Sequence, residues 1–223
     1  MDKITIVVCS QSDEFEKKDY ISHVKETCGV ECNFIFIGNN KTSLSEIYKN
    51  MVDESLTDII IFMHDDLHFF TKNWGNKIID IFKNNSDYSI IGLAGSADFD
   101  EKCAWWQNKE LYGQVAHKQD GNVWITEFSD KFEGLNEVCV IDGIFMAIDK
   151  TKIKHNFDTT FTGFHHYDTS FCLSNFLDGC KLGVTTEINV LHESVGFMPD
   201  EWYDNRYMLF EKLIGKFPIK VKK

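Results

Sequence analysis

Proline is scarce in this chain, which bears on how many domains the chain forms. Only Pro199 and Pro218 occur among the 223 residues, both near the C-terminus. Linkers between domains are commonly rich in proline, glycine or polar residues. No such stretch interrupts this sequence, and no internal repeat is visible. A single core can serve a chain of this length. We therefore expect one domain over residues 1–215, followed by a basic C-terminal tail at 216–223.

Long hydrophobic runs are also missing. The longest apolar runs, such as Ile59–Met63, are far shorter than the roughly 20 residues that cross a bilayer as a helix. The N-terminal Met1-Asp2-Lys3-Ile4 lacks the basic start, apolar core and small-residue cleavage site of a signal peptide. We expect no transmembrane segment and a cytoplasmic location.

The sequence has no C-x-x-C pair, although it contains seven cysteines, an odd number at irregular spacing. Cys28 and Cys32 are close in sequence, but no second pair of ligands at zinc-finger spacing accompanies them. Several other cysteines lie in apolar surroundings, as Cys139 does. We interpret all seven as reduced, mostly structural thiols of a cytosolic protein.

Positive charge is in deficit. The chain carries 23 Lys and Arg against 35 Asp and Glu, for a net charge of -12. Nucleic-acid binding requires a basic surface, so we expect no nucleic-acid partner. The sequence also lacks G-x-G-x-x-G and G-x-x-x-x-G-K-[ST], the usual glycine-rich phosphate loops. An anionic small molecule would need a local cation to offset the acidic field.

The most informative stretch is the apolar run Ile59–Met63 followed by His64-Asp65-Asp66. A short continuous apolar run is typical of a strand buried on both faces of a sheet. Charged residues are rarely buried without a partner, so the strand should end at Met63. In open α/β sheets, ligands bind at this carboxyl edge. Two carboxylates and a histidine there could hold a divalent cation. The alternative is an acidic loop that caps the following helix.

Similar apolar runs alternate with helical periodicity through the first part of the chain. We expect strands at 4–10, 31–38, 58–63 and 89–95, and helices at 14–27, from Ser43 onward, and at 73–84. Ser43 with Glu46 has the spacing of a capping box. This alternation predicts an α/β fold with a mostly parallel central sheet flanked by helices, to which we add a small antiparallel part.

The second part of the chain is less regular. Residues 96–137 are rich in aromatics, including Trp105 and Trp106, which suits a substrate-facing segment; alternatively these side chains pack the flank of the core. Asp142-Gly143 interrupts an apolar stretch, so that it forms either a tight hairpin or a polar contact to a ligand. Asp168 opens a helix expected over 169–177, where a carboxylate can be an N-cap or a base aimed into a pocket. His192 ends a late strand.

In this order, the features resemble a glycosyltransferase of the GT-A type, near the family-2-like enzymes and their small bacterial relatives. The matching segments span residues from Ile4 to Ser194, and the ordered set is more specific than any one of them. They are Ile4–Ser10, Leu44–Tyr48, Phe62–Asp66, Asp142–Ala147, Phe164–Asp168 and His192.

The resemblance implies a single GT-A (Rossmann-like) domain that transfers a sugar from a nucleotide-diphosphate donor, UDP- or GDP-linked, to a glycan or other hydroxyl acceptor. Mn²⁺ or Mg²⁺ usually bridges the diphosphate in this family, and inversion at the sugar is expected on the family-2 likeness alone. The family ends the strand with Asp-any-Asp, whose last carboxylate binds the metal and whose first faces the ribose. Here the last position is Asp66, and His64 departs from the pattern at the first.

The remaining roles follow the same likeness. Asp168 falls on the position of the catalytic base, with His165 and His166 as alternatives, since imidazole titrates near neutrality. His192 falls on the histidine that completes the metal site with Asp66. Donor binding is expected at Ser10, Asn39, His64, Asp65, Asp142 and Gly143, and acceptor binding at Trp105, Trp106, His165 and His166.

Two other functions fit some of these features. A metal-dependent phosphohydrolase would use the same Asp and His clusters, but further Asp, Glu or His at metal-ligand spacing are lacking. A non-catalytic domain that binds a nucleotide sugar or a carbohydrate would be consistent with His64 in place of an aspartate. The sequence leaves the oligomeric state open.

Overall fold

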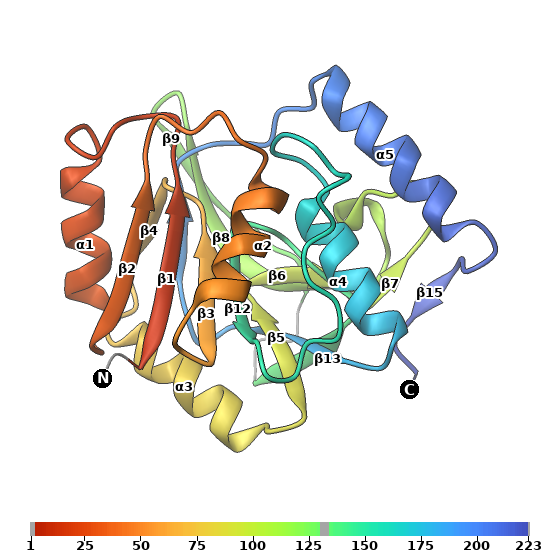
Figure 1. Ribbon diagram of the computed structural model, residues 1–223, viewed down its shortest axis with the longest axis horizontal. Coiled ribbons are helices and arrows are strands. Elements are labelled where there is room, and N and C mark those ends of the chain that lie inside the picture. The colour runs from red at the N-terminus through yellow and green to blue at the C-terminus, as the bar shows by residue number, and fades with distance from the viewer. Residues whose placement is uncertain (1–2, 130–133, 223) are drawn as a thin grey trace.

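The computed structural model describes residues 3–129 and 134–222. A seven-stranded sheet forms its centre (Figure 1). In spatial order its strands are β10 (Leu135–Val138), β13 (Lys181–Thr185), β5 (Tyr88–Gly92), β12 (Phe145–Asp149), β3 (Ile59–Met63), β1 (Ile4–Cys9) and β2 (Cys32–Ile37). β1, β3, β5 and β12 are almost wholly buried, as expected of apolar strands covered on both faces.

The central sheet is mixed, so the expectation of a mostly parallel sheet is only partly met. β1 runs parallel to β2 and β3, and β13 runs parallel to β5. β12 runs antiparallel to both β3 and β5, and β10 antiparallel to β13. A strand buried on both faces has the same apolar pattern in either direction, so the sequence could not show that β12 is reversed.

The reversal of β12 matters for function, because it brings two loops to one edge. β3 ends at Met63, which pairs with Phe145, the first residue of β12. His64 continues this ladder by donating its backbone N–H to the carbonyl of Ile144 at 3.0 Å. The segment before β12 therefore meets the segment after β3.

Five helices are found among the described residues: α1 (Lys18–Cys28), α2 (Leu44–Glu54), α3 (Trp74–Asn84), α4 (Tyr167–Leu177) and α5 (Asp200–Leu213). α2 and α4 lie in front of the central sheet in Figure 1. Their inner side chains form one aromatic cluster with Phe62 of the sheet and with Phe157 of the segment before α4, through stacked and edge-on contacts: Tyr48, Phe62, Phe157, Tyr167 and Phe171. Burying such large rings contributes strongly to core stability.

A second sheet is larger than the small antiparallel part that we expected. Its strand order is β11 (Val140–Ile141), β6 (Ala94–Ser96), β8 (Leu111–Gln119), β14 (Val190–His192) and β4 (Leu67–Phe69), and β9 (Asn122–Glu127) pairs with β8. Much of the aromatic segment 96–137 thus belongs to a hairpin of this sheet. A short 3-10 helix, η1 (Trp105–Gln107), precedes β8.

The C-terminal residues take part in the fold. β15 (Ile219–Lys220) pairs antiparallel with β7 (Asp98–Phe99), and Ile219 is buried. This part of the expected tail is therefore attached to the domain. None of the seven cysteines, all of which lie in the described residues, forms a disulfide. Within residues 3–129 and 134–222, no helix is both long and apolar enough to cross a membrane.

Candidate active site

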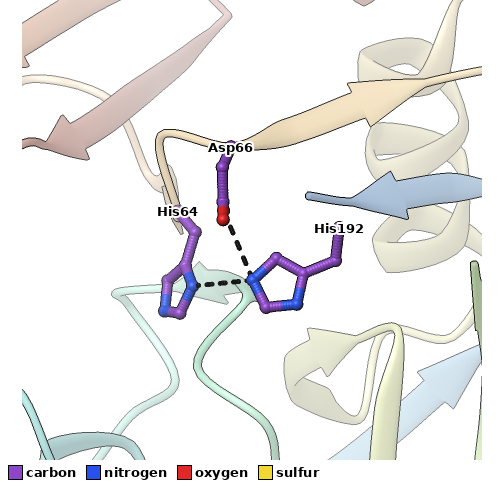
Figure 2. A group of neighbouring side chains, drawn as sticks. All are labelled: His64, Asp66 and His192. Carbon is purple, nitrogen blue, oxygen red and sulfur yellow. Dashed lines mark hydrogen bonds and ion pairs between the residues drawn. The ribbon is translucent and has the colours of Figure 1, made fainter. Parts of the chain in front are cut away.

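His64, Asp66 and His192 come together at the edge where β3 ends (Figure 2). One ligand atom from each residue lies within 4.8 Å of the others. Nδ1 of His64 is 3.4 Å from Nε2 of His192, which is 3.3 Å from Oδ1 of Asp66. β14 and β4 create this proximity by pairing His192 with Leu67, and the backbone N–H of Glu193 donates to the carbonyl of Asp66 at 3.1 Å.

One polar atom of this cluster lacks a hydrogen bond, although Nε2 of His192 lies within hydrogen-bond distance of the Ser194 hydroxyl and of Nδ1 of His64. Oδ1 of Asp66 is buried and has no hydrogen bond, despite its closeness to His192. A buried carboxylate oxygen without a donor is costly. The two imidazole nitrogens that face each other can be satisfied together if both offer lone pairs to one cation. The arrangement therefore suits a metal ion held by two nitrogens and one oxygen.

The charge state of the cluster supports the same conclusion. Burial tends to raise the pKa of Asp66, but the neighbouring His192 and His64 bring it below its ordinary value. Burial lowers the pKa of His64. Burial also disfavours charge on His192, yet its pKa is raised because Asp66 lies beside it. An ionised Asp66 and a neutral His64 are the forms in which these side chains bind metals, whereas His192, whose pKa is raised, would release its proton as a cation binds.

Asp65 points away from this cluster. Its carboxylate accepts a hydrogen bond from the hydroxyl of Ser10, at the end of β1, and lies 3.0 Å from the amine of Lys17. Lys17 also donates to the backbone carbonyl of Asp65. The adjacent carboxylates thus serve different elements, and Asp65 ties the β3 end to the segment after β1.

Asp142 and Asp168 form a second acidic group. Oδ2 of Asp168 accepts the N–H of Gly143 at 2.8 Å, and its Oδ1 accepts the N–H of Thr169 at 2.7 Å. Oδ1 of Asp142 accepts the N–H of Ile144. Burial, then the charge of Asp168, raises the pKa of Asp142 to about 6, and burial raises the pKa of Asp168.

Asp142-Gly143 does not form the tight hairpin that we had considered. β11 belongs to the second sheet and β12 to the central sheet, so the dipeptide crosses between sheets. A Cβ atom at Gly143 would lie 2.3 Å from the hydroxyl of Tyr167. Only glycine permits this close approach without displacement of Tyr167.

A cleft of about 890 Å³ contains most of the expected site residues. Those on its wall are Ser10, His64, Asp65, Trp105, Trp106, Asp142, Gly143, His165, His166, Asp168 and His192. Asn39 is exposed and does not line the cleft. Asp66 lies behind the wall formed by His64 and His192. The structure thus places metal, donor and acceptor candidates around one volume.

Sequence reasoning missed the contribution of α5 to this wall. Glu201 and Trp202 from its first turn line the cleft, together with the preceding segment Ser194–Pro199. His117 of β8 also lines it, and its ring lies 5.9 Å from that of His192. The aromatic and apolar residues from Trp202 to Ile214 predict a C-terminal helix that begins near Asp200, but not which site it would face. His117 could have been suggested only by knowing that β8 and β14 are neighbours.

The loop before α4 is held from two sides. The hydroxyl of Ser43 accepts the N–H of Gly163 at 2.9 Å, so it does not cap its own helix with Glu46 as we expected. From the other side, the amide of Asn205 in α5 donates to the carbonyls of Thr162 and His165. The predicted capping box is therefore wrong, because a tertiary contact takes the Ser43 hydroxyl.

The mixed α/β arrangement is consistent with a GT-A-like glycosyltransferase fold. A family model described as a glycosyltransferase-like family matches residues 5–213, and the chain belongs to that family. None of the curated proteins matches this sequence.

Two solved structures show the same fold at low identity. A crystal structure of A197 from STIV aligns with a TM-score of 0.53 at 13% identity, over 86% of each chain. A crystal structure of GalNAc-T7 with UDP, GalNAc and Mn²⁺ aligns with a TM-score of 0.56 at 8% identity, over 94% of this chain. The alignment covers 48% of that longer chain.

Proposed function

We propose that this protein transfers a sugar from a nucleotide-diphosphate donor to a hydroxyl group of an acceptor, with a divalent cation held by His64, Asp66 and His192. The observation that carries the proposal is the buried, unpartnered Oδ1 of Asp66 beside two imidazole nitrogens. The family match and the fold shared with a structure that contains UDP and Mn²⁺ support it.

The donor atoms favour Mn²⁺ over Mg²⁺. Mg²⁺ binds mostly through oxygen, whereas imidazole nitrogen suits transition metals. When bound, the cation would offset the negative charge that develops on the leaving diphosphate. The described residues that line the cleft include no Lys or Arg to take over this task. Ser10 and Asp65 lie at the same end, where the ends of β1 and β3 would contact the nucleoside.

Asp168 is our candidate for the base. It lies in the first turn of α4, and its raised pKa brings the carboxylate closer to neutrality, where proton transfer is most effective. Oδ2 of Asp168 accepts the N–H of Gly143 and keeps a second lone pair for an acceptor hydroxyl, whereas Oδ1 accepts both the N–H and the hydroxyl of Thr169. A base on the face opposite the leaving group would give inversion at the sugar.

Thermal unfolding with nucleotide and metal tests the proposal. UDP or GDP with Mn²⁺ should raise the melting temperature by about 5–10 °C at 100 times Kd, and either component alone should have a much smaller effect. Asp66→Ala should remove the joint effect. Asp80→Asn, at an exposed carboxylate on α3, is the matched control and should keep it. No joint stabilisation by any nucleotide would refute the metal-dependent transferase.

Turnover separates an enzyme from a binding domain. A panel of nucleotide sugars incubated with the protein and Mn²⁺ should release UDP or GDP from at least one member. Joint stabilisation without any release, in the presence of acceptor glycans, would assign the chain to the non-catalytic alternative.

A further inference from the structure

The far end of the cleft from the metal cluster is an aromatic wall. We define this wall as Trp105 and Trp106 of η1, Phe128, and His166 and Trp202 at the starts of α4 and α5, all of which line the cleft. Neighbouring rings of this wall pack against each other. The ring centroid of Trp202 lies 5.0 Å from that of His166 and 6.0 Å from that of Trp106, and the ring centroid of Trp105 lies 5.3 Å from that of Phe128. Trp106 is 39% exposed, so its face is open to a ligand.

The charged groups that line the cleft near this wall are carboxylates. Glu201 adjoins Trp202, and Asp168 and Asp142 lie beyond His166; all three carboxylates line the cleft. Burial lowers the pKa of His166 to about 4, so its ring is uncharged at neutral pH. None of the described lining residues is Lys or Arg. Arg206 lies over the ring of Trp202 at 5.9 Å, but it donates to the carbonyl of Lys102 and is not part of the lining.

The polar groups of the wall suit hydroxyls. The carboxylates that line the cleft can accept hydrogen bonds from hydroxyls. The ring nitrogens of His166 are buried, so they offer no surface to a ligand in the cleft. The carboxylate of Glu201 is fixed by the N–H of Phe164 at 3.0 Å and accepts only. A phosphate, sulfate or carboxylate would meet acceptors where it needs donors.

We infer that this wall binds an uncharged saccharide as the acceptor, with a sugar face stacked on the exposed ring of Trp106, which lies beside the buried ring of Trp202. Pyranose rings have an apolar face that packs on aromatic rings and a rim of hydroxyls. The metal would compensate the charge of the donor, but nothing described on this wall would compensate the charge of an acidic acceptor. The role of this saccharide as the acceptor rests on the proposed function, whereas its binding to the wall can be tested without turnover.

The test uses the full chain on an array of neutral, sialylated, uronic-acid and phosphorylated glycans, with and without UDP and Mn²⁺. We expect neutral glycans to bind at least tenfold more strongly than their acidic counterparts of equal length. Trp106→Ala should reduce that binding at least tenfold. Trp124→Ala removes a tryptophan of β9 with 40% exposure that does not line the cleft, and it should change nothing.

Trp202 is buried, so Trp202→Phe accompanies Trp202→Ala in case the smaller side chain unfolds the protein. Both should weaken glycan binding while the joint stabilisation by UDP and Mn²⁺ stays unchanged. Preferred binding of acidic glycans, or glycan binding unaffected by Trp106→Ala, would overturn the inference. Absence of all glycan binding with nucleotide stabilisation intact would also overturn it and leave the transferase standing. Neutral glycan binding without any nucleotide effect would sustain the subsite and refute the transferase.

Discussion

The two ends of the cleft are built in different ways. At the metal end, strand ends from both sheets fix His64, Asp66 and His192 through ladder hydrogen bonds. At the other end, the aromatic wall is assembled from η1, α5 and the loop before α4, which side chains such as Asn205 hold in place. The polar residues of the metal end are held by the hydrogen bonds of the sheets. The aromatic residues of the wall are held by contacts between side chains and loops.

This difference teaches where specificity can change. Ladder pairing leaves little freedom at the metal end, because a register shift would separate His192 from Asp66. The wall depends on elements outside the central sheet, so its residues can differ without disturbing the metal cluster. Under the proposed function, activation of a donor and choice of an acceptor would thus be separable properties of this cleft.

The largest effect is expected from Asp168→Asn, which should reduce the rate of transfer without changing nucleotide and metal binding. The amide keeps the size of the side chain but cannot take a proton, so we expect the rate of transfer to fall about 100-fold or more. Joint stabilisation by nucleotide and Mn²⁺ should stay as in the native protein. Single-turnover rates and melting temperatures measure the two effects separately. An unchanged rate would show that another group, such as His165, is the base.

A smaller effect is expected on stability as a function of pH. The pKa of Asp142 is raised to about 6 in the folded protein, so folding favours the protonated form. Stability is then lost as pH rises from about 4 through about 6. Asp142→Asn should remove this loss. Between pH 4 and pH 7.5, the free energy of unfolding of the variant should therefore rise by about 1–3 kcal/mol relative to that of the native protein. Denaturant titrations at both pH values measure it; an unchanged difference between the two proteins would contradict it.

The smallest effect concerns the choice of metal. His64→Asp replaces a nitrogen donor by oxygen, so the preference for Mn²⁺ over Mg²⁺ should decrease about tenfold. Melting curves with UDP and each metal report the change. His68→Asp, at an exposed histidine of β4, is the control. Glycan binding should be the same in both variants. An equal preference for Mn²⁺ over Mg²⁺ in both variants would show that His64 is not a metal ligand.

Much of the metal end of the cleft could be predicted from the sequence. The run Ile59–Met63 and the polar residues after it indicated a buried strand that ends at a ligand site, and β3 ends at Met63 as expected. The apolar positions of α2 and α3 also predicted those helices closely. Local pattern was sufficient here because each element is buried by its own periodic face.

The rest depended on contacts distant in sequence. The apolar residues of β12 form the same pattern in either strand direction, so they do not predict that β12 is antiparallel to its neighbours. The pairing of β14 with β4 joins segments more than a hundred residues apart. We expected His64 to contact the donor, but the structure brings it next to His192, which makes a ligand role the better proposal. The position of Trp202 depends on how α5 packs, which no local pattern encodes.

Gly163 sets a limit on how this sequence can vary. A Cβ atom there would lie 1.9 Å from Oε1 of Glu201, and the residue has a φ of 71°, which side chains other than glycine rarely adopt. A single methyl group at this position would expel the Glu201 carboxylate from the N–H of Phe164. The first turn of α5 would then lose one of its attachments while the sheets stayed intact. Descendants of this sequence could thus exchange one acceptor surface for another through a change at a residue that never meets the sugar.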